Sequence, residues 1–152
     1  MASMPRLIEN KKAHLSYEIL EKFEAGLELF GFEVKSLKKG QGSLLGAYVS
    51  TRGNELFLVG ATVPPYQSAN TPKEYIATRA RRLLLTAREI RMLIGREHER
   101  GLTIIPLSIY TKGPRIKIEI AVARGLKKFD KRQVIRKREE NRRIEKLLKG
   151  GQ

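Results

Sequence analysis

The sequence predicts a mainly β protein: a small, partly closed antiparallel barrel with about three short helices and a basic C-terminal tail. Two observations lead to this fold class. Apolar and polar residues alternate over several short segments that are separated by glycine-containing turns, and the positive charge is concentrated in the last fifth of the chain. A period of two is typical of strands with one buried face. We expect the barrel in residues 1–123 and the tail in residues 124–152.

The longest alternating segment is Tyr17–Leu29, where apolar side chains occupy most odd positions and charged ones many even positions. This pattern predicts one long, half-buried strand. Gly26 lies inside the segment, and a glycine within a strand often marks a bend or bulge. We therefore expect the strand to turn a barrel corner at Gly26.

Two hairpins are expected elsewhere, which brings the predicted number of strands to about five or six. Leu102–Tyr110 is joined to the alternating run at 115–122 by a Gly-Pro turn, and Ala47–Thr51 is joined to Leu56–Val63 around Gly53. Glycine-containing turns between β-rich runs are typical of hairpins.

Helical signals are fewer. Thr86 and Glu89 have the spacing of a capping box, which predicts a helix from about Ala87 towards Glu99. Glu33–Lys39 precedes a glycine and is expected to form a short helix. Val63–Ala80 carries three prolines and is expected to be a long connection, a kind that is uncommon unless it is functional.

Composition narrows the possible functions. The chain has 152 residues, a formal net charge of +15 and no cysteine, which excludes disulfides, thiolate zinc sites and a cysteine nucleophile. No apolar run approaches the length needed to cross a bilayer, and the N-terminus lacks the apolar stretch of a secretory signal, so we expect a cytoplasmic protein without a membrane partner. A chain this basic attracts polyanions; charge alone leaves RNA, DNA and an acidic membrane open.

The tail holds more than half of the excess charge. Residues 124–152 contain 12 Lys and Arg against 4 Asp and Glu, a net charge of +8 out of +15, and few large apolar residues. Such a segment cannot bury enough apolar surface to order itself, so we expect it to be disordered when free, with helical potential from about Lys131. Its apolar face is too small for firm membrane insertion.

Catalysis has little support in the sequence, and we expect a protein that is not an enzyme and has no cofactor or metal. The two histidines, His14 and His98, lie in charged surroundings, and neither a phosphate-binding loop nor a zinc-binding helix motif is present. A metal-dependent nuclease stays open because its carboxylates need not be adjacent in sequence.

Nucleic-acid binding has more support. Arg79, Arg81 and Arg82 precede an apolar run that can anchor their guanidinium groups, which suit bidentate phosphate contacts and base stacking. Lys35 belongs to a cluster of lysines on the predicted short helix. Phe129 lies among cations of the tail, an arrangement that serves base stacking and backbone neutralisation.

The order of these motifs resembles the small protein B (SmpB) family, the SsrA-binding proteins of bacteria. The resemblance covers nearly the whole chain and rests on the runs at 10–13 (NKKA), 23–26 (FEAG), 31–37 (GFEVKSL), 82–85 (RLLL), 101–103 (GLT) and 130–132 (DKR). It implies a barrel of the OB-fold type that binds the tRNA-like domain of transfer-messenger RNA (tmRNA) and delivers this RNA to stalled 70S ribosomes for trans-translation. Indirect partners through the RNA would be alanyl-tRNA synthetase and elongation factor Tu.

The resemblance also implies which residues bind. The RNA-binding residues would be Asn10, Lys11, Lys12, Glu24, Lys35, Arg79, Arg81, Arg82 and Lys117. A tail that becomes helical in the empty message channel, against the small-subunit rRNA of the decoding centre, would use Gly125, Lys127, Lys128, Phe129, Asp130, Lys131 and Arg132. The chain departs from the family at two positions. Leu126 stands between Gly125 and the two lysines that commonly follow this glycine directly, and Phe129 replaces the tyrosine or histidine that is common there. An ordinary ribosomal or rRNA-binding protein of the same barrel class is the alternative.

Overall fold

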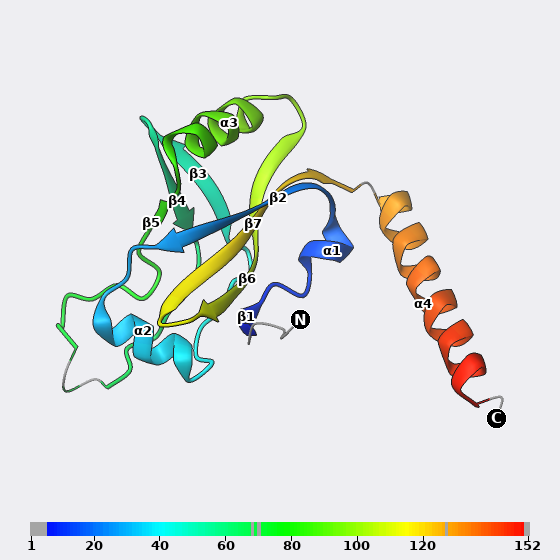
Figure 1. The fold of residues 1–152 in the computed structure, drawn as a ribbon, viewed down its shortest axis with the longest axis horizontal. Helices are drawn as coiled ribbons and strands as arrows, with labels where there is room; N and C mark the ends of the chain where they lie inside the picture. Colours follow the sequence, from blue (N-terminus) through cyan, green and yellow to red (C-terminus); the bar gives the residue numbers. More distant parts are fainter. Residues whose placement is uncertain (1–5, 68, 70, 127, 151–152) are drawn as a thin grey trace.

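The computed structural model describes residues 6–67, 69, 71–126 and 128–150, and within them seven strands form one antiparallel sheet (Figure 1). The strand order is β1-β6-β7-β2-β5-β4-β3. The strands are β1 (Arg6–Glu9), β2 (Tyr17–Leu27), β3 (Tyr48–Arg52), β4 (Glu55–Val59), β5 (Arg81–Leu84), β6 (Leu102–Lys112) and β7 (Arg115–Gly125). The sheet curls until β3 lies beside β6, with no ladder between these two strands in the described residues, so the predicted mainly β, partly closed barrel is confirmed.

The described part of the chain also contains four helices: α1 (Ala13–Ser16), α2 (Gly31–Lys38), α3 (Ala87–Glu97) and α4 (Lys128–Gly150). The predicted capping box of α3 is present, because Thr86 Oγ1 accepts from the Glu89 amide while the Glu89 carboxylate accepts from the Thr86 amide. The sequence analysis missed the single turn of α1. In Figure 1, α3 lies across one end of the barrel, α2 lies at the other, and α4 leaves the barrel on the side of α1.

The two predicted hairpins are confirmed as β3–β4 and β6–β7. Strands β1 and β5 were not counted among the expected five or six. Both are only four residues long, and each takes its place through partners far away in sequence: β1 pairs with β6, and β5 pairs with β4 and with the end of β2. Segments this short show too little alternation to be identified from sequence.

The long strand was predicted correctly, but its irregularity was placed at the wrong residue. The register of β2 against β7 shifts between Ile19 and Glu21, and not at Gly26. Tyr17 and Ile19 therefore pack in a small cluster on one face of the sheet, while Phe23, Ala25 and Leu27 pack in the main core on the other face.

Gly26 allows strands β2 and β5 to approach each other closely. It pairs with Lys117 of β7 on one side and with Leu84 of β5 on the other, and an added Cβ would lie 3.2 Å from the Leu84 Cβ. A side chain at position 26 would therefore require Leu84 to move by a few tenths of an ångström at the point where the two halves of the sheet meet.

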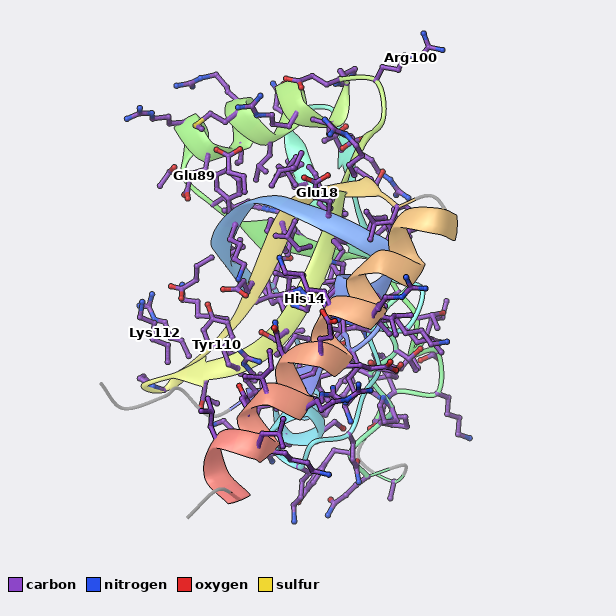
Figure 2. All side chains as sticks on the ribbon, turned by 90° about the vertical axis from the view of Figure 1, so that its right-hand side faces the viewer. His14, Glu18, Glu89, Arg100, Tyr110 and Lys112 are labelled. Carbon is purple, nitrogen blue, oxygen red and sulfur yellow. The ribbon has the colours of Figure 1, made fainter. Side chains whose placement is uncertain are left out.

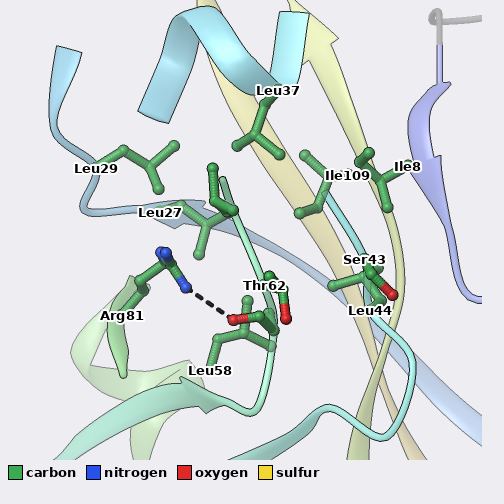
Figure 3. Close-up of a pocket in the computed structure, with 12 residues that line it drawn as sticks. Ile8, Leu27, Leu29, Leu37, Ser43, Leu44, Leu58, Thr62, Arg81 and Ile109 are labelled. Atoms are coloured by element: carbon green, nitrogen blue, oxygen red, sulfur yellow. Dashed lines mark hydrogen bonds between the residues drawn. The ribbon is translucent and has the colours of Figure 1, made fainter. Parts of the chain in front are cut away.

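Inside the curled sheet, aliphatic side chains fill the space between the strands and α2. Figure 3 shows a small cavity among them, lined by Ile8, Leu27, Leu37 and Ile109, with Arg81 entering at its edge. The Arg81 side chain is 1% exposed, and its Nη1 donates to the Ala61 carbonyl at 3.0 Å. A charged group this deep in the core requires a partner of opposite charge.

That partner is Glu33 of α2, whose side chain is 0% exposed. Arg81 Nη2 lies 2.7 Å from Glu33 Oε2, and Arg79 Nη2 donates to Glu33 Oε1. The Phe30 amide also donates to Oε1, at 2.8 Å, and the Tyr75 hydroxyl lies 2.9 Å from Oε2. This Glu33 cluster attaches both ends of the predicted long connection at 63–80 to α2, because Tyr75 also bonds the Val63 carbonyl.

Replacing Glu33 with Gln should destabilise the fold. Breaking a buried ion pair by removing one partner costs about 3–5 kcal/mol, since Arg81 would keep its charge without compensation. Equilibrium urea unfolding at pH 7 measures this loss. Glu55→Gln is the matched control, because Glu55 is exposed and its nearest pair, to Arg82, is 3.7 Å long; we expect a change below about 0.5 kcal/mol.

The same cluster predicts the direction of the acid sensitivity. Burial works to raise the pKa of Glu33, but the hydrogen bonds from Arg79, the Phe30 amide and Arg81 outweigh it, so the pKa is lowered from 4.5. A lowered folded-state pKa contributes stability that is complete above the unfolded pKa and is lost as the pH falls through the folded value. Below about pH 4.5 the wild type should lose stability faster than Glu33→Gln does; parallel acid-unfolding curves would contradict this.

Candidate nucleic-acid interface

The outer face of strands β2, β7 and β6 carries a cluster of polar side chains near the β6–β7 turn. Glu24 comes from β2, Lys117 from β7, and Tyr110 and Lys112 from β6. The Tyr110 hydroxyl donates to Glu24 Oε2 at 2.5 Å, and Lys112 Nζ donates to Oε1 at 3.0 Å. Figure 2 shows Tyr110 and Lys112 on the same side of the molecule, near the end of the β6–β7 hairpin. We call these four residues the Glu24 cluster.

Strand alternation produces this arrangement. Ala25 and Leu27 of β2 point into the main core, as do Ile116 and Ile118 of β7, so the residues between them face outward. On β6 the register shifts between Pro106 and Ser108, which places Tyr110 opposite Lys117. Without this shift Tyr110 would lie on the face of Ile104, inside the main core.

The electrostatics of the cluster keep Glu24 ionised. The hydrogen bond from Tyr110, then the one from Lys112, lowers the pKa of Glu24, with a further contribution from the charge of Lys117. Burial raises the pKa of Tyr110 first, and the neighbouring carboxylate of Glu24 raises it further. At neutral pH the cluster therefore presents a fixed carboxylate among cations, with the Glu24 side chain 35% exposed.

A shallow groove continues from this cluster across the barrel. It is lined by backbone and apolar groups of Gly26, Leu29, Val34 and Leu84, with cationic side chains of Arg115 and Lys117 at its edge. Leu84 is 44% exposed despite its apolar side chain. Apolar groups next to cationic side chains suit the ribose and base surfaces of RNA next to its phosphates. The sequence analysis did not single out Leu84, although its place in the arginine-leucine run offered a signal.

The three arginines that the sequence grouped together have different environments. In β5 the burial alternates, so Arg81 faces the core and Arg82 faces solvent. Arg79 precedes the strand; its guanidinium lies 4.3 Å from the Phe30 ring centroid, and its side chain is 25% exposed. Arg82 is 45% exposed, with weak pairs to Glu28 and Glu55. Because protein acceptors enclose the guanidinium of Arg81, this residue stabilises the fold and is not placed to contact RNA.

The N-terminal candidates lie at the other end of β2. Asn10 donates its side-chain amide to the Pro106 carbonyl at 2.8 Å, Lys11 is exposed, and the Lys12 carbonyl accepts from the first turn of α1. Together with Tyr17 and Gly125, Asn10 and Lys12 line a second groove at the end of β7. Seven residue steps separate Tyr17 from Glu24, about 23 Å at roughly 3.3 Å per residue, so the predicted RNA-binding residues form two separate surfaces.

Lys35 lies on a third part of the surface. It is exposed on α2, and its Nζ lies 6.0 Å from the centroid of the Tyr66 ring in the long connection. Lys35 is therefore free to contact a polyanion.

The barrel extends past the expected boundary at residue 123. Arg124 pairs with Glu18, Gly125 pairs with Tyr17, and the Leu126 amide donates to the Ser16 carbonyl at 2.9 Å. Helix α4 then begins at Lys128, which agrees with the predicted helical potential and starts earlier than Lys131. Disorder of the free tail stays a prediction. Lys127 and the side chains of five predicted tail residues lie outside the described part of the structure: Lys128, Phe129, Asp130, Lys131 and Arg132.

The two histidines lie on different helices: His14 belongs to α1, and His98 caps the end of α3, where its Nδ1 lies 2.7 Å from the Ile94 carbonyl oxygen. Arg138 of α4 donates to the backbone carbonyl of His14 at 2.9 Å, and burial, followed by the charge of Arg138, lowers the pKa of His14. Across the described residues, no group of three or more His, Asp or Glu could hold a metal ion. None of the described helices is both long and apolar enough to span a membrane.

A family model, curated relatives and a solved structure all match this chain, and all three concern the same family. The family model described as "SmpB protein" matches residues 7–150. An SsrA-binding protein of Syntrophobacter fumaroxidans is 46% identical over 149 residues, covering 97% of this chain and 92% of the relative. One from Burkholderia vietnamiensis is 41% identical over 145 residues, covering 95% and 98%, respectively.

A solved structure described as "tmRNA-SmpB: a journey to the center of the bacterial ribosome" contains a chain of the same fold. Its TM-score is 0.66 at 36% identity, and the match covers 84% of this chain and 93% of that one. The match to the family model runs from β1 to the end of α4, so it includes both surfaces of the barrel and the basic C-terminal helix. The chain belongs to the SmpB protein family.

Proposed function

We propose that this protein binds the tRNA-like domain of tmRNA through the Glu24 cluster and the adjoining groove, and delivers this RNA to stalled ribosomes in the cytoplasm for trans-translation. It acts by binding, without a catalytic step of its own. The observation that carries the proposal is the full-length match to relatives that are named SsrA-binding proteins. The charge distribution supports it, because a basic barrel and a separately basic helix suit two RNA contacts.

The proposed RNA-contacting residues are those whose side chains reach the surface. In the Glu24 cluster these are Glu24 and Lys117. Arg79 lies over the Phe30 ring, Arg82 lies near Glu28 and Glu55, and Lys35 lies on the separate surface of α2. On the second surface, at the root of α4, Lys11 and Lys12 continue towards Gly125, and Asn10 holds this segment against β6. We place the contacts with the ribosomal decoding centre and message channel on this second surface and on the segment from Lys127 to Arg132.

A salt series separates specific from generic RNA binding. The affinity of the purified full-length protein is measured for the tRNA-like domain of tmRNA and for ordinary tRNA between low and physiological salt. Nonspecific binding falls steeply with salt because it depends on counterion release. We expect selective binding of the tRNA-like domain to survive at about 0.15 M salt. Equal affinities that fall together would favour a generic basic barrel, and metal-dependent cleavage of either RNA would favour a nuclease.

Glu24→Gln should weaken binding to the tRNA-like domain by about tenfold. The change removes the charge that Tyr110 and Lys112 hold in place, and hydrogen bonds to a charged acceptor are worth about 1.5–3 kcal/mol. Glu18→Gln is the matched control, because Glu18 is an exposed carboxylate of the same strand, 3.8 Å from Arg124 at the opposite end. Affinity that is unchanged in Glu24→Gln would remove Glu24 from the interface.

Truncation after Leu126 should separate the two parts of the function. The cut leaves all of β7 and the Leu126–Ser16 hydrogen bond in place, so the barrel keeps its fold. We expect affinity for the tRNA-like domain to change by less than tenfold, which is about 1.4 kcal/mol. Tagging of proteins on stalled ribosomes, measured in a reconstituted translation system, should fail. A truncated protein that still supports tagging would contradict a role of the tail.

A further inference from the structure

Tyr110 has an unusual environment for a residue at the edge of a binding surface. Tyr110 is only 5% exposed. Its hydroxyl nevertheless reaches across β7 and donates to the carboxylate of Glu24, which is 86 positions away in sequence. A ring that is enclosed in this way cannot stack on a base. Its polar end is nevertheless aimed at the carboxylate of the proposed RNA surface.

The contact leaves Glu24 with free acceptor capacity. Tyr110 occupies one lone-pair site on Oε2 and Lys112 one on Oε1, whereas a carboxylate offers about four such sites. The Glu24 side chain is 35% exposed, so part of it is accessible to a ligand. An oriented carboxylate can accept from the amino and imino groups of a base edge or from a ribose 2′-hydroxyl, and these donors distinguish one folded RNA from another.

The environment keeps Tyr110 protonated and Glu24 ionised at neutral pH. The pKa of Tyr110 is raised, by burial first and then by Glu24 and Glu119, so the phenol remains a donor. The pKa of Glu24 is lowered, so the carboxylate remains an acceptor. The charged groups around the bond are Lys112 of β6 and Lys117 and Glu119 of β7.

We propose that Tyr110, assisted by Lys112, is a positioning residue that fixes the Glu24 carboxylate for hydrogen bonds from RNA donors, and thereby sets selectivity among RNAs without touching the RNA. This inference rests on the proposed function and extends it. A free glutamate next to a phosphate backbone would turn away from the RNA and repel it. When a phenol and an ammonium group hold it in place, the same carboxylate strengthens the binding of an RNA that places a hydrogen-bond donor next to it and weakens the binding of an RNA that does not.

The test compares full-length wild type, Tyr110→Phe, Glu24→Gln and the double variant. Tyr110→Phe removes one hydroxyl and no charge, so the salt dependence of binding should keep its slope. We expect affinity for the tRNA-like domain of tmRNA to fall about five- to tenfold, as for loss of one typical hydrogen bond, with affinity for ordinary tRNA unchanged. The double variant should bind as weakly as Glu24→Gln alone, because Tyr110 acts through Glu24.

Two controls separate positioning from folding. Tyr48→Phe removes a hydroxyl from a tyrosine of β3 that is 47% exposed, and it should leave selectivity unchanged. An NMR titration of the Glu24 side-chain carboxyl, without RNA, should show its pKa rising towards the ordinary value in Tyr110→Phe. That measurement reports the contact itself and does not depend on RNA or on overall stability.

Each outcome has a separate meaning. Selective wild-type binding that Tyr110→Phe leaves unchanged would overturn this inference and leave the proposed function standing. Full additivity of the two substitutions, or an equal loss of affinity for both RNAs, would also overturn it, since Tyr110 would then act independently of Glu24. Wild-type protein that binds both RNAs equally would overturn the proposed function and this inference with it.

Discussion

The joint between β2 and β5 is the constraint on which the rest of the structure depends. Only two residue pairs connect these strands, Gly26 with Leu84 and Leu27 with Leu83, yet they join the β1-β6-β7-β2 half of the sheet to the β5-β4-β3 half. Two additions strengthen so short a ladder. The Glu28 amide donates to the Arg82 carbonyl at 3.0 Å, and Arg81 of the same strand is tied to Glu33 of α2. The apolar groove forms directly over this joint, so the exposed Leu84 is held by buried charge on the other side of the strand.

The parts of the fold that sequence could predict are those set by local alternation and turns. The two hairpins, the capped helix α3 and the long strand each produce a signal within a dozen residues. Four residues are too few to identify β5 as a strand, but once it is known to be one, its period of two places Arg81 and Leu83 on one face and Arg82 and Leu84 on the other. Grouping the three arginines by charge concealed this alternation, which assigns one of them to the core and leaves Leu84 exposed.

The parts that sequence could not predict depend on long-range register. Contact between Tyr110 and Glu24 requires β7 to lie between β6 and β2, and it also requires the shift at Pro106/Ser108 that moves Tyr110 out of the main core. Pro106 lies at this shift, and a proline within a strand is a local signal for a bulge, but it does not show which side chain of another strand Tyr110 will contact. The separation of Asn10 and Lys12 from Glu24 likewise has two causes. The length of β2 could be predicted from the sequence, whereas its pairing with β7 could not.

The basic C-terminal helix stands apart from the barrel for a physical reason. With 23 residues, α4 is about 35 Å long at roughly 1.5 Å per residue, and its apolar residues near the end, Ile144, Leu147 and Leu148, are 53%, 70% and 76% exposed. Among the described residues, α4 contacts α1, where Arg138 donates a hydrogen bond to the His14 carbonyl. Burial therefore adds little to its stability, and its excess positive charge opposes close packing against a barrel that is itself basic. A polyanionic surface would neutralise the helix along its length and so remove the electrostatic cost of bringing the helix close to other basic groups.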